Sequence, residues 1–328
     1  MTVRNYNIDF IKALAIISVI LIHGLSNDTL YAILAPYYIW QTVPVFMILL
    51  GYNSANSFTK RGYERLSEIY NQQYLLKKAK RILLPFTLIW FAQILIQFFY
   101  FDKTNIVDLL TSFFVGGYGP GSYFIPVIVQ ATLLAPILYL ILKKQPTKMM
   151  IILFFVSILI DLATYWLDIS GSLYRLLIIR HIFSVTLGVW FSLVKTRITF
   201  NWLLLPAALS FGYITAVHYF NYELVIEEYW HSQHAPAYFY VLLLIILGMK
   251  FFNIKKESVL EKSFILIGEA SFHIFLTQMF YFWFISRWLP DLNGIVYIML
   301  FLTVPILSGI GFYYLDNYLN RKLSDATK

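Results

Sequence analysis

The sequence has no cysteine and few charged residues. The absence of cysteine from all 328 positions excludes disulfide bonds, thiolate nucleophiles and cysteine-ligated zinc sites. Charged side chains make up 13% of the chain, whereas soluble domains carry about a quarter. So few charges do not cover a water-exposed surface, and their shortage together with the apolar composition excludes a water-soluble globular protein and a disordered one.

Apolar and aromatic side chains take the place of the missing charges. They amount to 59% and 19% of the sequence, and the mean hydropathy is +0.69. An apolar run of roughly 20 residues crosses a bilayer. The hydropathy therefore predicts an all-α, polytopic integral membrane protein with one transmembrane domain over residues 1–328 and no soluble domain. Its ten predicted spans are 8–26, 36–57, 82–101, 122–142, 149–168, 174–194, 199–219, 236–251, 263–284 and 294–315.

The basic residues alternate between the two sides of these spans. With the N-terminus inside, 20 of the 25 Lys and Arg residues fall in inner segments. Lys103, Arg175 and Arg287 fall on the outer side, and Lys12 and Arg180 fall within spans. The positive-inside rule then predicts that both termini are cytoplasmic. The net charge of +8 is thus a topology signal, and no nucleic-acid partner is expected because the positive charges are spread over six segments.

Two further features suit contact with membrane lipids. The longest inner loop, 58–81, is basic and is predicted to lie as an amphipathic segment on the anionic inner leaflet. Aromatic residues near the predicted outer ends are interpreted as interfacial anchors rather than as a sugar-binding platform. They include Tyr37, Tyr38, Trp40, Trp166, Trp230, Trp283 and Trp288.

The first span carries three ionisable residues: Asp9, Lys12 and His23. Lys12 and His23 are eleven residues apart, which puts them on one helix face with a separation of roughly 16 Å along the axis. Asp9 lies one turn before Lys12 and can pair with it. An imidazole can exchange a proton at neutral pH, and an ammonium can bind an anionic group. The alternative is an interfacial Asp9–Lys12 pair with a histidine that only caps the outer end of the helix.

Four segments, in order, resemble motifs of the membrane-bound acyltransferase 3 family. Lys12 and His23 fit its opening-helix pattern of a basic residue, ten residues and histidine. Val43–Tyr52 resembles its Pro-x-Phe…Ser-Gly-Phe motif, and Lys80–Pro85 its basic residues followed by proline at the start of the third span. Ile267–Gln278 resembles its Gly-x-x-Ser-Phe-x-Ile-Tyr-Leu-x-His stretch.

This resemblance implies an O-acyltransferase of the bacterial inner (plasma) membrane. Such a protein moves an acyl group, usually acetyl, from cytoplasmic acyl-CoA to a cell-envelope glycan on the far side. Acyl-CoA (acetyl-CoA) is then a co-substrate, and no tightly bound cofactor is expected. The resemblance assigns His23 as catalytic base or acyl-handling residue, beside Asp9 and Lys12. It assigns Lys12, with Arg81 and Lys80, to the phosphates of the coenzyme.

The sequence departs from the family's pattern at two positions. Leu50 stands where the family usually has Ser, and Gln278 stands where it usually has His. Gln278 is still expected to contact substrate. The chain also resembles the intercellular-adhesin polysaccharide modifiers, proteins once discussed as exporters.

Further polar residues in or near spans are candidates for substrate binding. Tyr123 and Gln130 either contact substrate or make ordinary helix–helix hydrogen bonds. Arg175, Arg180 and His181 are placed in the sixth predicted span. Arg180 either pairs with Asp161, or it binds with Arg175 an acidic sugar, a lipid phosphate or acyl-CoA.

Several remaining residues receive no firm role. Glycines at 116–121 predict a tight outer turn rather than a phosphate loop. Glu227, His231 and His234 have a spacing that suits a metal only if they are helical, and no metal is expected. His218 and His273 are expected to be core residues, and Glu269 is a possible second acid or base.

Two other functions compete with acyl transfer. A polysaccharide transporter or flippase would share the span count and would suit Arg180 and Asp161 within the membrane. A membrane sensor with a degenerate enzyme fold would suit the departures at Leu50 and Gln278, although the Lys12–His23 stripe argues against it.

Overall fold

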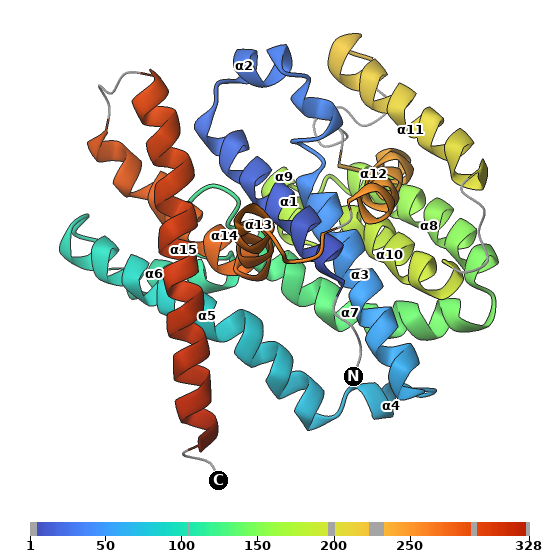
Figure 1. Ribbon diagram of the computed structural model, residues 1–328, viewed down its shortest axis with the longest axis horizontal. Helices are drawn as coiled ribbons and strands as arrows, with labels where there is room; N and C mark the ends of the chain where they lie inside the picture. The colour runs from blue at the N-terminus through green and yellow to red at the C-terminus, as the bar shows by residue number, and fades with distance from the viewer. Residues whose placement is uncertain are drawn as a thin grey trace. The chain divides into compact units, whose positions relative to one another are not determined.

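The computed structural model describes residues 5–103, 105–195, 201–222, 233–252, 254–289 and 294–325 (Figure 1). Every regular element among these residues is a helix, which confirms the prediction of an all-α protein. Six helices are long and apolar enough to cross a membrane, judged by length and composition. Two shorter apolar helical stretches, Ile179–Val194 and Ala235–Phe251, coincide with two more predicted spans. The total of ten spans and the cytoplasmic termini stay predictions.

The helices gather into two compact units, each built from separate stretches of the chain. The first unit takes Met1–Ser26, Leu75–Ile125 and Ile254–Lys328. Its elements are α1 (Tyr6–Gly24), most of α5 (Gln72–Phe99), α6 (Ile106–Phe114), α13 (Val259–Glu269), α14 (Ser271–Trp283), η4 (Ile285–Trp288) and α15 (Gly294–Asp325).

The second unit takes Asn27–Tyr74 and Pro126–Asn253. Its elements are α2 (Asn27–Ala32), η1 (Ala35–Tyr37), α3 (Thr42–Arg61), α4 (Leu66–Ile69), most of α7 (Phe124–Lys144), α8 (Pro146–Trp166), α9 (Gly171–Leu176), η2 (Ile179–His181), α10 (Ile182–Val194), α11 (Asn201–Tyr219), η3 (Ala235–Ala237) and α12 (Tyr238–Phe251).

The helix ends follow local capping chemistry. Asn5 caps α1 by accepting a hydrogen bond from the backbone N–H of Asn7, at 3.1 Å. Ser258 and Glu261 form a capping box at the start of α13. The backbone N–H groups that donate to the Glu261 carboxylate lower its pKa. Gly62 ends α3 in the left-handed conformation, at φ +67°.

Two predicted segments are divided in the structure. The apolar run 263–284 consists of two helices, α13 and α14, because Ala270 leaves the helical conformation between them. The basic segment 58–81 is divided among three helices. It contains the end of α3, the single turn of α4 and the start of α5.

Helix α8 has its polar side chains inside the protein and its apolar side chains outside. Ser157 and Asp161 are buried, whereas Ile151, Phe155 and Leu159 form an exposed stripe at a spacing of four residues. A water-soluble helix has the opposite arrangement. This inversion is what a helix that faces lipid requires.

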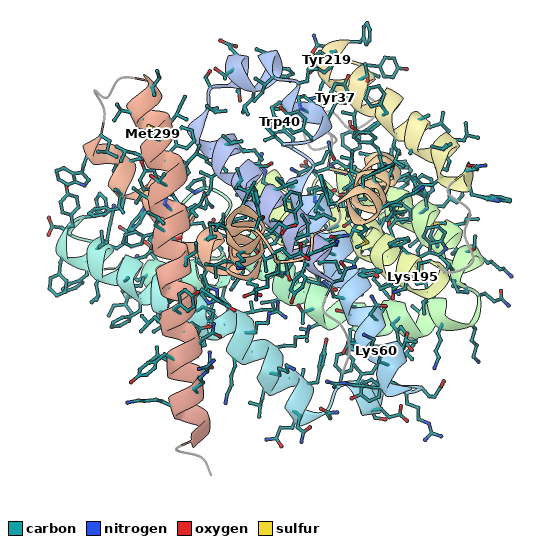
Figure 2. The ribbon with its side chains drawn as sticks, in the orientation of Figure 1. Tyr37, Trp40, Lys60, Lys195, Tyr219 and Met299 are labelled. Carbon is teal, nitrogen blue, oxygen red and sulfur yellow. The ribbon has the colours of Figure 1, made fainter. Side chains whose placement is uncertain are left out.

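The second unit also carries different side chains at its two ends. Figure 2 shows Lys60 and Lys195 at one end, and Tyr37, Trp40 and Tyr219 at the other. Tyr37 stacks on Tyr219 with ring centroids 5.6 Å apart. The basic end and the aromatic end match the predicted inner and outer sides.

Candidate functional site

The predicted pairing of Asp9 with Lys12 is present on α1. The Lys12 Nζ lies 2.6 Å from Asp9 Oδ1, and the two side chains are 18% and 5% exposed. A charge pair so deeply placed costs less than two separate charges would. Lys12 is therefore held in a defined position, six residues after the first residue of α1.

A glycine of α13 lies directly against this pair. A Cβ atom built on Gly268 would overlap the backbone of Asp9, including its carbonyl oxygen. Only a residue without a side chain allows α13 to approach α1 so closely. This contact gives a physical reason for the glycine in the family-like segment Ile267–Gln278.

The His23 imidazole lies near the other end of α1, beside an aromatic ring and a glycine. Its ring centroid is 6.0 Å from that of Phe282, in an edge-on arrangement. A Cβ atom built on Gly121 would lie 3.6 Å from His23 Nε2. Among the residues that the structure describes, neither ring nitrogen of His23 takes part in a hydrogen bond. The imidazole is thus free to exchange a proton with a bound molecule.

The chain from α13 into α14 runs in parallel with α1. Gly268 contacts Asp9, and Phe282 contacts His23. The two contacts are separated by fourteen residues on each segment, from 9 to 23 on α1 and from 268 to 282 on α13 and α14. The position of an α14 residue along the axis of α1, relative to Lys12 and His23, therefore follows from its residue number.

The glycine turn predicted at 116–121 is present, and it is held by Gln93 of α5. The Gln93 amide donates to the Tyr118 carbonyl oxygen at 2.6 Å and accepts from the Tyr118 N–H at 3.0 Å. Gly119 and Gly121 have φ values of +114° and +83°, which residues with side chains rarely adopt. A Cβ on Gly119 would also meet the Met279 carbonyl oxygen of α14 at 2.5 Å.

Gln278 is fully buried beside this glycine turn. Its Nε2 donates to the Pro120 carbonyl oxygen across 3.4 Å. Its Oε1 is buried without a hydrogen-bond partner in the part of the chain that the structure describes. A buried acceptor left unpaired costs about 1–3 kcal/mol. The substrate contact predicted for Gln278 would satisfy this oxygen.

The remaining predicted residues of the first unit lie near these groups along the chain or on α5. Tyr123 is half-buried at the end of the glycine turn, one residue before α7. Lys80 and Arg81 are exposed on α5. The structure thus brings together Asp9 with Lys12, and His23 with Gly121.

Sequence reasoning missed a second buried polar group in the first unit. His273, expected to be a core residue, lies 3.0 Å from the Asp316 carboxylate of α15. Asp316 also accepts a hydrogen bond from Asn320 at 3.0 Å. Glu269 accepts a longer one, 3.4 Å, from Tyr313. The two partners of the His273–Asp316 pair are 43 residues apart, so no local spacing signals it.

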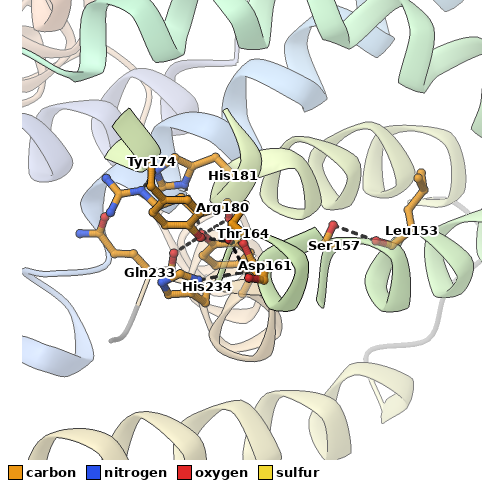
Figure 3. A network of polar contacts seen from close by, with 10 residues as sticks. Leu153, Ser157, Asp161, Thr164, Tyr174, Arg180, His181, Gln233 and His234 are labelled. Carbon is orange, nitrogen blue, oxygen red and sulfur yellow. Dashed lines mark hydrogen bonds and ion pairs between the residues drawn. The ribbon is translucent and has the colours of Figure 1, made fainter. Parts of the chain in front are cut away.

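In the second unit, Asp161 joins a network of buried polar side chains (Figure 3). Tyr174 donates a hydrogen bond of 2.6 Å to Asp161 Oδ1, and His234 Nδ1 lies 3.6 Å from Asp161 Oδ2. Among the described residues, the side-chain contacts recorded for Asp161 are with Tyr174 and His234, and the Arg180–Asp161 pair stays a prediction.

Arg180 and His181 belong to the same network, at its other side. Arg180 Nε donates to His181 Nε2 at 3.1 Å, and His181 Nδ1 lies 3.2 Å from the Tyr238 hydroxyl. His181 is fully buried, and Arg180 is half-buried. A ring that accepts from a guanidinium in this way is neutral, with its proton on Nδ1.

Gln130 and Arg175 take contrasting positions in the second unit. The Gln130 side-chain amide donates to the Leu176 carbonyl at 2.7 Å and accepts from the Ile178 N–H at 3.1 Å. Both ends of that amide thus hold the backbone between α9 and η2. Arg175 is exposed at the end of α9.

The histidines left without a role have different outcomes. His218 packs edge-on against Trp40, with ring centroids 4.9 Å apart. His234 is buried beside Asp161. Glu227 and His231, the other members of the weighed metal spacing, lie outside the described residues, as does Trp230.

Comparison with known proteins agrees with the motifs. No curated protein and no solved structure shows a detectable match to the chain. The model of a family described as "Acyltransferase domain", acyltransferase 3, matches residues 5–314, nearly the whole chain. The match includes all four motif-bearing segments, and with them both Lys12 and His23 of α1. The chain therefore belongs to the membrane-bound acyltransferase 3 family, and it is an acyltransferase.

Proposed function

We propose that the chain transfers an acyl group, acetyl in the simplest case, from cytoplasmic acyl-CoA to a glycan hydroxyl. The acceptor is a cell-surface polysaccharide or its lipid-linked precursor, and the membrane is the bacterial plasma membrane. One observation carries the proposal within an acyltransferase family. The His23 imidazole makes no hydrogen bond in the described structure and lies beside a glycine turn. It shares one face of α1 with Lys12, which is paired with Asp9 roughly 16 Å away along the axis.

His23 would act as general base. Its imidazole takes the proton of the acceptor hydroxyl, and the oxygen attacks the thioester carbonyl carbon. The carbon–sulfur bond then breaks, and the departing thiolate receives the proton from the imidazolium. The products are a glycan ester and free CoA, with no net gain or loss of protons. Transient transfer of the acyl group to the imidazole is a second route with the same balance.

Lys12 would bind a phosphate of the acyl donor, assisted by the exposed Lys80 and Arg81 of α5. Asp9 holds the Lys12 ammonium in place at 2.6 Å. The separation of roughly 16 Å between Lys12 and His23 along α1 suits a molecule with phosphates at one end and a thioester at the other.

Further residues in each unit, taken separately, are proposed to contact a substrate. Tyr123 and Gln278 are proposed for the first unit, and Gln130, Arg175, Arg180 and His181 for the second. A guanidinium such as that of Arg180 favours an acidic sugar or a phosphate.

Replacement of His23 tests the proposal. His23→Ala should abolish both glycan acylation and the release of CoA while leaving protein abundance in the membrane unchanged. Ser18→Ala is a matched control, because Ser18 lies on the same helix and, among the described residues, donates a hydrogen bond only to the Leu14 carbonyl oxygen, at 2.9 Å. It should retain acylation. Full acylation by His23→Ala would remove the proposed base.

A polysaccharide transporter is the second candidate, favoured by the buried network of Asp161, His181 and His234. Purified protein in vesicles separates the two functions. An enzyme consumes acyl-CoA and releases CoA in the presence of glycan. A flippase moves glycan across the vesicle membrane without any acyl donor.

A further inference from the structure

The side-chain amide of Gln278 has one possible orientation. The Pro120 carbonyl can only accept a hydrogen bond, so the NH₂ group of Gln278 faces it, at 3.4 Å. The amide oxygen must then point elsewhere, and it finds no partner among the described residues although it is fully buried. Proteins rarely leave such an atom unpaired. A donor on a bound molecule, an N–H or an O–H, would satisfy this oxygen.

The level of Gln278 along α14 identifies which part of a bound molecule it meets. Gln278 precedes Phe282, the ring beside His23, by four residues. Four residues of helix correspond to about 6 Å. This displacement is directed toward the Gly268–Asp9 contact, because α14 runs in parallel with α1. Gln278 thus lies on the Lys12 side of His23, the side on which the proposed function puts the acyl donor.

The arm of acyl-CoA carries a suitable donor at this level. Two methylene groups separate its sulfur from the nearest amide nitrogen, a reach of about 4 Å by ordinary bond lengths. With the thioester at His23 and the phosphates at Lys12, this amide N–H lies just inward of the reacting carbon. The hydroxyl of the acceptor glycan would instead approach His23 from the opposite side.

We propose that Gln278 Oε1 accepts a hydrogen bond from the amide N–H that lies nearest the thioester of the acyl donor. Gln278 is then a positioning residue that sets how far the donor arm advances along α1. This inference rests on the proposed function, and it adds a subsite to it. The histidine that the family usually has at this position could fill the same role, because a neutral imidazole can accept the same hydrogen bond.

The test compares two donors: acyl-CoA, and an analogue in which an ester oxygen replaces the amide N–H nearest the sulfur. The wild-type protein should prefer acyl-CoA by about tenfold or more in kcat/KM, because the ester leaves the buried Gln278 oxygen unpaired. Gln278→Leu should use both donors equally well. Gln278→His should restore the preference. Thr277→Val, which removes a 2.9 Å hydrogen bond to the Pro305 carbonyl of α15, should keep the wild-type preference.

Three results would overturn the inference. The first is a wild-type protein that uses both donors equally, which leaves the proposed function standing and does not depend on how any variant folds. The second is a Gln278→Leu variant that keeps the preference but shows a raised KM for the glycan, which would assign the oxygen to the acceptor hydroxyl. The third is a wild-type protein that uses neither donor, since the proposed function then fails as well.

Discussion

The two basic side chains of α1 differ in how the fold satisfies them. Lys12 is paired with Asp9 at 2.6 Å, whereas His23 makes no hydrogen bond within the described ranges. The lysine is thus fixed by the protein, and the histidine is left available. This difference agrees with a binding role for Lys12 and a proton-transfer role for His23.

Lys12→Gln should raise the KM for acyl-CoA by about tenfold or more and change kcat little, because it removes a charge that binds phosphate. It also removes the Lys12 partner of the buried Asp9 carboxylate, and breaking a buried ion pair costs about 3–5 kcal/mol. The double variant Asp9→Asn/Lys12→Gln serves as control. It should regain thermal stability without regaining donor affinity. An unchanged KM in a stable double variant would mean that Lys12 does not bind the coenzyme.

The residues of α1 were predictable from the sequence, and their surroundings were not. Spacing alone places Asp9, Lys12 and His23 on one helix, and the ion pair at their inner end follows from it. The contacts of Gly121 and Gln278 depend on a loop and a helix that are distant in the sequence. Likewise, His273 and Asp316 are 43 residues apart on two different helices, and no periodicity in the sequence indicates their contact.

At the scale of the elements, glycines set how closely the helices approach. In the second unit, α3 and α10 cross with their backbones in contact. A Cβ on Gly51 would overlap the Val185 carbonyl, and a Cβ on Gly188 would overlap the Ile48 carbonyl. Small residues at such crossings replace the hydrophobic driving force that lipid surroundings do not supply. Gly51 belongs to the family-like segment Val43–Tyr52, so this motif has a packing role.

Gly188→Ala should destabilise the protein by about 1–3 kcal/mol, because the added methyl group meets backbone that cannot rotate away. The expected readout is a lower midpoint of thermal unfolding in detergent. Gly212→Ala on α11 is the matched control, since nothing lies within 4 Å of its Cβ position. That control should be neutral or slightly stabilising, as alanine favours helix. Equal stability of the two variants would refute the close crossing.

The elements themselves were largely predictable from hydropathy. Apolar runs of membrane length reappear as helices with ends shifted by up to ten residues, because the bilayer imposes both length and composition. The break at Ala270 could not be predicted from an unbroken apolar run. The segment 58–81 was predicted to lie on the inner leaflet, and that position stays a prediction. Its division could not be read from composition, because most of its basic residues belong to the ends of α3 and α5 while Arg65 precedes the turn of α4.

At the scale of the whole molecule, the distribution of charge predicts how the chain lies in a membrane. Lys60 and Lys195 mark one end of the second unit, and Tyr37 and Trp40 mark the other (Figure 2). The positive-inside rule assigns the basic end to the cytoplasm. This orientation would bring acyl-CoA and glycan to opposite sides of one protein.

The lack of cysteine makes this orientation directly testable. Lys60→Cys and Tyr222→Cys each introduce a single thiol, at exposed positions near the predicted inner and outer sides. An impermeant maleimide should label Tyr222→Cys in intact cells and Lys60→Cys only after the membrane is permeabilised. The reverse pattern would invert the topology, and with it the side from which the donor arrives.

The Asp9–Lys12 contact has a consequence for turnover. Free CoA retains every phosphate of acyl-CoA. A lysine that bound phosphate without competition would therefore bind the product CoA as tightly as acyl-CoA. The Asp9 carboxylate, three residues away on the same helix, competes with phosphate for Lys12 and is permanently attached to the chain. If acyl-CoA is the donor, as proposed, the carboxylate would re-form its ion pair with Lys12 whenever the phosphates dissociate, and this competition would speed the release of CoA.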